Sequence, residues 1–210
     1  MNGPSTAAVL LLGGALCFLT GAAIPIRWLE VWFSPLERYL ELIAAHRKAW
    51  SWMNGLMIAA VALNTAGLSV LAAVTSRPAI IAGATAYGIG SIWWVMVASY
   101  RSTASVWAAD RLASIQRLPE AFEALDGWMG LLFRLYILMA YASELAVGAG
   151  LLQTALVPSW SAWIMVILGV GGFVSQMPGT NRISALRSVF EVPIVVHVTP
   201  ALIAIALLFR

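Results

Sequence analysis

Two residues of opposite charge stand in the otherwise apolar stretch Phe133 to Gly150: Arg134 and Glu144. In a helix their spacing of ten residues corresponds to about 15 Å along the axis and about 80° around it. They share one broad face but are too far apart to pair, so each needs its own partner. Arg134 is close to one predicted membrane surface, where a long side chain reaches the headgroups at little cost.

Glu144 is expected at a greater depth, and its side chain is too short to reach the surface. A carboxylate there must pair, contact water or stay protonated, and ionisable groups inside a membrane are functional candidates by default. We therefore predict a ligand or proton site at Glu144. A structural hydrogen bond to another helix is the alternative.

Asn54 and Asn64 repeat the same ten-residue spacing in an earlier apolar segment. If the two segments pack side by side as helices, Asn64 lies level with Glu144 and Asn54 lies level with Arg134. Both asparagines are therefore candidates for the same polar site.

The two histidines are expected near one membrane surface, His46 just before a span and His197 about one turn inside another. Pro200 follows His197 and frees a backbone carbonyl by removing one helical hydrogen bond. With Arg134 and Glu191 at similar depth, these residues predict a second polar cluster. Ordinary helix packing is the alternative.

Several chemistries lack their sequence signals. Two histidines alone do not indicate a b-type haem, and no cofactor is assigned. No metal site is predicted, because too few ligand residues converge. Lys48 is the only lysine and lies in a surface segment, which excludes the usual retinal Schiff base. The lone Cys17 permits no internal disulfide.

Composition places these residues in a membrane protein. The chain of 210 residues is 61% hydrophobic and only 10% charged, with a mean hydropathy of +0.89. A soluble domain of this size is about 25% charged. The net charge of +3 does not indicate nucleic-acid binding, because the cations lie in short loops beside apolar segments.

We predict one all-α integral membrane domain over residues 1–210, a helix bundle with six spans. Each candidate is long enough to cross a bilayer. The predicted spans are 7–25, 50–74, 79–100, 128–154, 159–177 and 193–209.

Loop charges predict the orientation. Nine cations fall in the first, third and fifth loops, against two on the opposite side. By the positive-inside rule those three loops face the cytoplasm, and both termini lie outside. The nine are Arg27, Arg38, Arg47, Lys48, Arg101, Arg111, Arg117, Arg182 and Arg187.

Each of the three basic loops also predicts a short amphipathic helix, within 34–50, 118–128 and 181–193. The first begins with a capping-box pattern, Ser34 and Glu37 around Pro35. Such helices lie in the headgroup layer or serve as simple connectors. The expected architecture is three consecutive hairpins, each with a surface helix at its base.

The stretch Leu151 to Phe173 carries Pro158, Trp160 and Trp163 ahead of a glycine-rich segment. This Pro-x-Trp-x-x-Trp turn resembles a group of uncharacterised bacterial six-helix membrane proteins. The resemblance covers about 25 residues and implies an architecture and a bacterial inner membrane. It implies no catalytic residue.

The leading functional hypothesis is a non-enzymatic membrane protein with a polar cavity for a small, hydrophobic or amphipathic molecule. Glu144, Asn64, Arg134 and His197 would line that cavity, and Glu144 could couple transport to protons. One alternative is an enzyme on a lipid-soluble substrate, with His197 as base and Arg134 on an anionic headgroup. Another is a scaffold whose partners are membrane-protein subunits, or a homo-oligomer.

Overall fold

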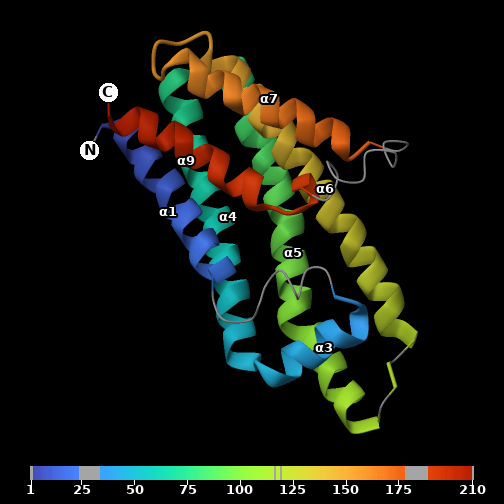
Figure 1. The fold of residues 1–210 in the computed structure, drawn as a ribbon. Coiled ribbons are helices and arrows are strands. Elements are labelled where there is room, and N and C mark those ends of the chain that lie inside the picture. Colours follow the sequence, from blue (N-terminus) through green and yellow to red (C-terminus); the bar gives the residue numbers. More distant parts are fainter. Residues whose placement is uncertain (1, 24–33, 116, 119, 178–188, 210) are drawn as a thin grey trace.

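The fold is all-helical throughout the described residues. The computed structural model describes residues 2–23, 34–115, 117–118, 120–177 and 189–209, and no strand occurs in these ranges. The all-α prediction is therefore confirmed. The longer helices, drawn in Figure 1, are α1 (Gly3–Ala23), α3 (Leu36–Ala45), α4 (Arg47–Thr75), α5 (Pro78–Ile115), α6 (Glu120–Leu151), α7 (Ser159–Ser175) and α9 (Ile194–Leu208).

Four of these helices, α1, α4, α5 and α6, are long and apolar enough to cross a membrane. The other two apolar helices are shorter, with 17 residues in α7 and 15 in α9. At 1.5 Å per residue they reach about 25 and 22 Å, against a hydrocarbon core of about 30 Å. The predicted count of six spans is therefore not confirmed.

The long helices α5 and α6 extend well past the predicted membrane edge. No glycine or proline occurs between Tyr100 and Leu118, so nothing interrupts the helix, and α5 continues to Ile115. The prediction of a separate surface helix within 118–128 is wrong. Those residues include the first turns of α6, which runs without a break into the apolar segment.

The surface helix predicted within 34–50 is present as α3. It starts at Leu36, with Pro35 in the N-cap position and no capping side chain, so the predicted capping box is wrong. Leu40 and Ile43 are fully buried and fix α3 against the bundle. The third surface helix, predicted within 181–193, falls largely outside the described residues.

The six apolar helices pack in chain order, with one exception. α1 packs along α4, α4 along α5, α5 along α6, and α6 along α7, whereas α9 packs mainly on α1. The third predicted hairpin, α7 with α9, is therefore the weakest of the three. Close approach depends on small residues: a Cβ at Gly148 would lie 2.9 Å from the Ala162 carbonyl oxygen, as expected for helices in lipid.

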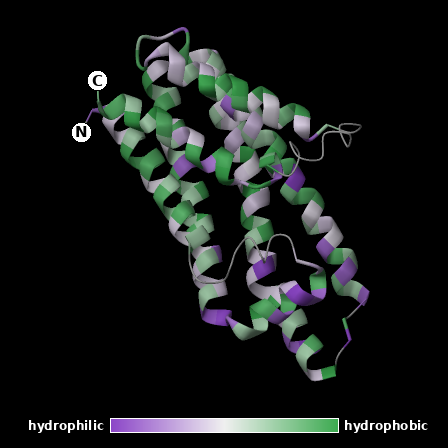
Figure 2. Ribbon diagram, in the orientation of Figure 1, coloured by the Kyte–Doolittle hydropathy of each residue, from purple (hydrophilic) through white to green (hydrophobic). Residues whose placement is uncertain are grey.

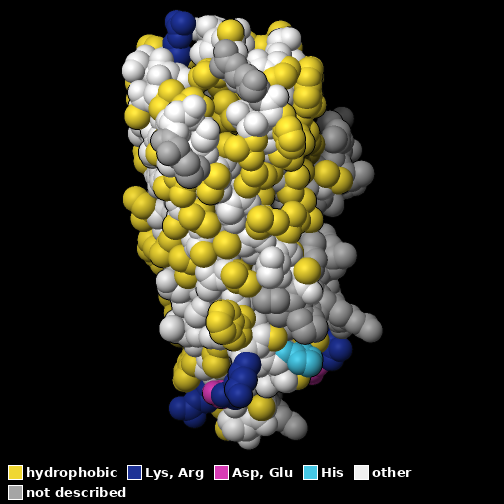
Figure 3. Space-filling model, turned by 90° about the vertical axis from the view of Figure 1, so that its left-hand side faces the viewer, with side chains coloured by type: hydrophobic (Ala, Val, Ile, Leu, Met, Phe, Trp, Pro, Cys, Tyr) yellow, Lys and Arg dark blue, Asp and Glu magenta, His cyan; other side chains and the backbone are white. Residues whose placement is uncertain are grey.

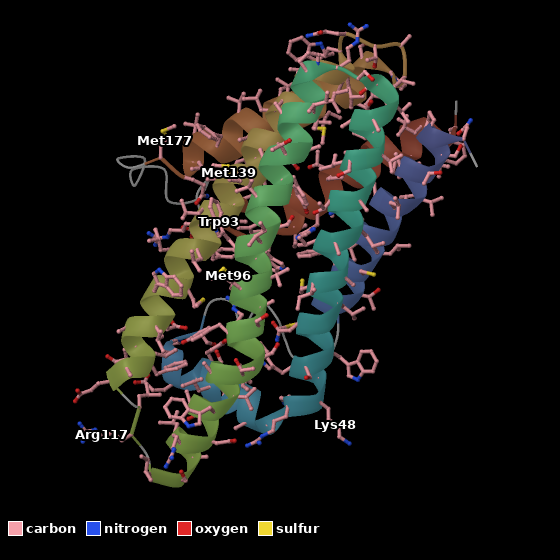
Figure 4. All side chains as sticks on the ribbon, turned by 180° about the vertical axis from the view of Figure 1, so that it is seen from behind. Lys48, Trp93, Met96, Arg117, Met139 and Met177 are labelled. Carbon is pink, nitrogen blue, oxygen red and sulfur yellow. The ribbon has the colours of Figure 1, made fainter. Side chains whose placement is uncertain are left out.

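Polarity divides the molecule along its length. Figure 2 shows hydrophilic residues concentrated near α3 and the far ends of α5 and α6. Figure 3 shows apolar side chains over the remainder of one face. Lys48 and Arg117 mark this polar end (Figure 4), and both ends of the chain lie at the opposite end, beside the α4–α5 turn (Figure 1).

The outer surface of the apolar part is itself apolar. Leu16, Ile92 and Ile167 are each more than 60% exposed. Large exposed apolar surfaces are rare in soluble monomers but are expected where helices face lipid. The several long apolar helices and this surface indicate a membrane protein.

Candidate functional site

A buried polar network is centred on His197, in the first turn of α9. The side chain is completely buried, and both ring nitrogens have partners. Nδ1 lies 3.1 Å from the Asn64 amide nitrogen, and Nε2 lies 3.0 Å from the Tyr136 hydroxyl. The Asn64 amide also donates to the Tyr87 hydroxyl at 3.3 Å. Four helices, α4, α5, α6 and α9, therefore contribute to one hydrogen-bonded cluster.

Aromatic and small residues close the space around this network. Phe18 of α1 stacks on the His197 ring with centroids 4.1 Å apart, and Trp94 lies edge-on at 6.3 Å. Gly14 allows α1 to lie directly against Asn64, because any Cβ there would collide with the amide. The Asn64 side-chain oxygen is buried and has no hydrogen-bond partner in the described part of the chain.

Glu144 adjoins the same network from α6. It is 2% exposed, and neither carboxyl oxygen has a hydrogen-bond partner among the residues that the structure describes. Thr199 of α9 lies beside it, but the Thr199 hydroxyl donates to the Val195 carbonyl at 2.7 Å. Burying an ionised carboxylate without a partner is strongly unfavourable. This position therefore favours the neutral, protonated form of Glu144, or an ionised form paired with a group that the described residues do not supply.

Asn64 and Glu144 are related through α5 in the structure, not through direct packing of α4 on α6. α5 packs against both α4 and α6, and its Tyr87 is the group that links the two helices. Tyr87 bonds Asn64 and lies within electrostatic range of Glu144 and Tyr136. The condition under which this grouping was predicted, direct side-by-side packing of the two segments, is not met, because α4 and α6 each pack against α5 rather than against each other.

Other predicted site residues lie elsewhere. Asn54 is buried but donates to the Trp50 carbonyl of its own helix at 2.9 Å. His46 is exposed at the junction of α3 and α4. The predicted grouping of His46 with His197 is therefore wrong. His197 is at the inner end of a short, obliquely packed helix (Figure 1) rather than at the polar surface.

Arg134 and Glu191 do meet, in a separate pocket at the polar end of the bundle. This pocket has a volume of about 360 Å³ and is lined from α3 and the residue two before it, α5, α6 and the short helical segment 189–191 before α9. Two of its charged residues, Arg101 and Asp126, interact electrostatically. The lining residues are Ser34, Leu36, Tyr39, Arg101, Asp126, Gly130, Phe133, Arg134 and Glu191.

Aromatic side chains fix α3 over this pocket. Trp50 donates from its indole nitrogen to the Arg101 carbonyl at 2.9 Å, and Tyr39 packs edge-on to Trp50 at 5.5 Å. The Tyr39 hydroxyl donates to Ser105 at 3.3 Å. Burial raises the pKa of the Tyr39 phenol, so the hydroxyl stays a neutral donor at neutral pH.

An aromatic layer separates the pocket from the buried network. Phe133 lines the pocket, and Tyr136, one turn further along α6, bonds His197. Trp94 of α5 contacts both, with centroids 5.7 Å from Phe133 and 4.8 Å from Tyr136. The pocket and the network are thus consecutive along one helix: Phe133 belongs to the pocket, Tyr136 to the network, and the Trp94 ring packs against both.

Sequence reasoning missed Tyr136, Trp94, Arg101 and Asp126. A signal existed for Tyr136, since Tyr136, Ala140 and Glu144 recur every four residues on one helix face, and all three are buried. No comparable signal existed for Arg101 and Asp126, because their meeting depends on the pairing of α5 with α6.

No group of three or more potential metal ligands occurs within the described ranges. The chain matches no family model, no curated protein and no solved structure. The features that bear on function are therefore the two polar sites themselves.

Proposed function

We propose that this protein binds and transports a small or amphipathic molecule across a membrane, and that Glu144 carries a proton in the process. The observation behind this proposal is the buried Glu144 carboxyl, which lacks a hydrogen-bond partner in the described residues. A group of this kind is costly inside a membrane, and intramembrane carboxyls commonly serve proton relays. The adjoining network of His197, Tyr136 and Asn64 supplies further proton donors and acceptors.

The proposed setting is a bacterial cytoplasmic membrane with the polar end facing the cytoplasm. The excess of Arg and Lys in the loops at that end supports this orientation. Both chain ends lie at the opposite end (Figure 1), which would then face outside. We further propose that α7 and α9 complete a set of six membrane-embedded helices. The likeness to uncharacterised six-helix proteins is part of this proposal.

The enzyme hypothesis has less support from the geometry. A general base needs access to a substrate proton, whereas His197 is completely buried and already engaged at both ring nitrogens. Arg134, its proposed headgroup-binding partner, lines the separate pocket beyond the aromatic layer.

The proposal is tested with Glu144→Gln, which retains the shape of the side chain and removes its acidity. In infrared spectra of the membrane-reconstituted protein, we expect a protonated-carboxyl band that disappears in the variant. In liposomes carrying a pH-sensitive dye and an imposed membrane potential, proton uptake should fall at least about tenfold, the loss typical of removing a proton-transfer group.

The matched control is Asn54→Leu, which changes a buried polar residue of α4 whose hydrogen bond lies within its own helix. It should leave both readouts unchanged. An unaltered carboxyl band and unaltered uptake in folded Glu144→Gln would contradict the proposal and shift support to the scaffold hypothesis.

A further inference from the structure

Among the residues that the structure describes, the pocket at the polar end is lined by as many cations as anions. Two cations, Arg101 and Arg134, and two anions, Asp126 and Glu191, line the same space of about 360 Å³. This volume is within the range of small-molecule sites, about 300–1,000 Å³. The pocket is therefore large enough for a headgroup and small enough to select one.

This charge pattern discriminates among ligand classes. A simple anion would be attracted by the two guanidinium groups but repelled by the two carboxylates. A simple cation would be attracted by the carboxylates but repelled by the guanidinium groups. Like charges at close range reject the wrong partner. A group that carries one charge of each sign matches both pairs. Arginine forks suit phosphate oxygens, and carboxylates accept from an ammonium group with its three N–H donors.

The remaining lining suits the neutral part of such a headgroup. Tyr39, whose hydroxyl donates to Ser105, forms part of one wall, and Phe133 lines the inner end. Gly130 has no other atom within 4 Å of where a Cβ would be, so its missing side chain is part of the open volume. A primary ammonium could also contact the two aromatic rings.

The surroundings favour an amphiphile over a free solute. On the same helix, two residues before Gly130 and one residue after it, Trp128 and Leu131 are 47% and 52% exposed. Exposed aromatic and aliphatic side chains of this kind are typical of the interface between headgroups and acyl chains. A molecule with its headgroup in the pocket would have apolar surface along which to extend its chains.

We propose that this pocket binds the zwitterionic headgroup of a phospholipid, with the phosphate at Arg101 and Arg134 and a primary ammonium at Asp126 and Glu191. The inference deepens the proposed function, because it names the class of amphipathic molecule and the site that admits it. It does not depend on proton transfer by Glu144.

The test is native mass spectrometry of the delipidated protein, titrated separately with dioleoyl phosphatidylethanolamine, dioleoyl phosphatidylglycerol and dioleoylglycerol. We expect one retained phosphatidylethanolamine and at least tenfold weaker binding of the other two. Free phosphoethanolamine, the same headgroup without acyl chains, is titrated for comparison. Binding of phosphoethanolamine as tight as that of the lipid would overturn the assignment to a lipid.

Two variants locate the site. Gly130→Leu places a side chain in the pocket. Gly127→Leu adds the same side chain about one turn earlier on the same exposed face, also in open space, at a residue that is not among the pocket's lining residues. We expect Gly130→Leu to bind phosphatidylethanolamine at least tenfold more weakly, and Gly127→Leu to bind it with unchanged affinity. Arg134→Gln, an exposed substitution, should weaken phosphatidylethanolamine binding by a similar factor.

Equal binding of all three lipids, or retained binding in folded Gly130→Leu and Arg134→Gln, would overturn the inference. The result is separable from the proton hypothesis, because Glu144→Gln should still bind phosphatidylethanolamine. Loss of proton uptake with intact lipid binding would support both. Intact proton uptake with selective lipid binding would retain the pocket and remove the role of Glu144.

Discussion

The apolar half of the bundle and its polar end solve the same problem, placing charged and polar side chains, in opposite ways. Around His197 the polar groups are almost completely buried. His197, Asn64, Tyr87 and Tyr136 are joined at distances of 3.0–3.3 Å, whereas the Asn64 side-chain oxygen and the Glu144 carboxyl have no hydrogen-bond partner among the described residues. At the polar end the charged residues are partly exposed, and the pairs between them span helix surfaces that water can reach.

This difference in access to water decides where single substitutions should change stability most. Without water, a lost partner leaves a buried group unsatisfied, and tight packing leaves no room for added atoms. With water present, a lost partner is replaced by solvent, and an exposed ion pair contributes about 0–1 kcal/mol. Effects on stability should therefore decrease from the apolar half to the polar end.

The largest effect is expected where helix backbones touch. A Cβ at Gly169 of α7 would lie 2.9 Å from the Cα of Leu145 on α6, and backbone atoms cannot move aside as a side chain can. Gly169→Ala should lower the free energy of unfolding by about 1–3 kcal/mol. Thermal unfolding in detergent measures it.

The control, Gly127→Ala, adds the same methyl group in open space. It should be neutral or stabilise α6 by up to about 1 kcal/mol through helix propensity. Equal effects at the two glycines would mean that α6 and α7 do not pack as closely as described.

The next effect concerns the buried network. Asn64→Leu removes the donor to both His197 and Tyr87, at a cost of about 1–2 kcal/mol. Asn54→Leu breaks one bond within α4 and should cost less than half as much. Equal losses in thermal unfolding would show that Asn64 contributes no more than a local hydrogen bond.

How well the sequence predicts a feature of this structure depends on whether that feature arises within one segment or from contacts between distant segments. Hydropathy predicted the helices, since each apolar segment satisfies its own backbone. Helix ends were predicted less well: the segment after Tyr100 has ordinary polarity but no breaking residue, so α5 continues to Ile115. Charge composition alone could not reveal that.

The candidate sites divide in the same way. Glu144, Asn64 and His197 were recognisable because a polar residue in an apolar helix needs a partner. Their connection through Tyr87 and Tyr136 could not be predicted from the sequence. It depends on the packing of α5 against both α4 and α6, and on the packing of α9 on α1. Arg134 and Glu191 were expected beside His197, but Phe133, Trp94 and Tyr136 separate them from it.

The smallest effect is expected at the polar end, where Arg47 of α4 pairs with Asp110 of the extended α5. Both side chains are about half exposed, at 52% and 44%, so the pair should contribute about 0–1 kcal/mol. Asp110→Asn should therefore barely change thermal unfolding at low salt. The change should vanish near 1 M salt, where the Debye length is about 3 Å. A double-mutant cycle with Arg47→Gln isolates the pair, and a coupling as large as the loss in Asn64→Leu would break the contrast between the two halves.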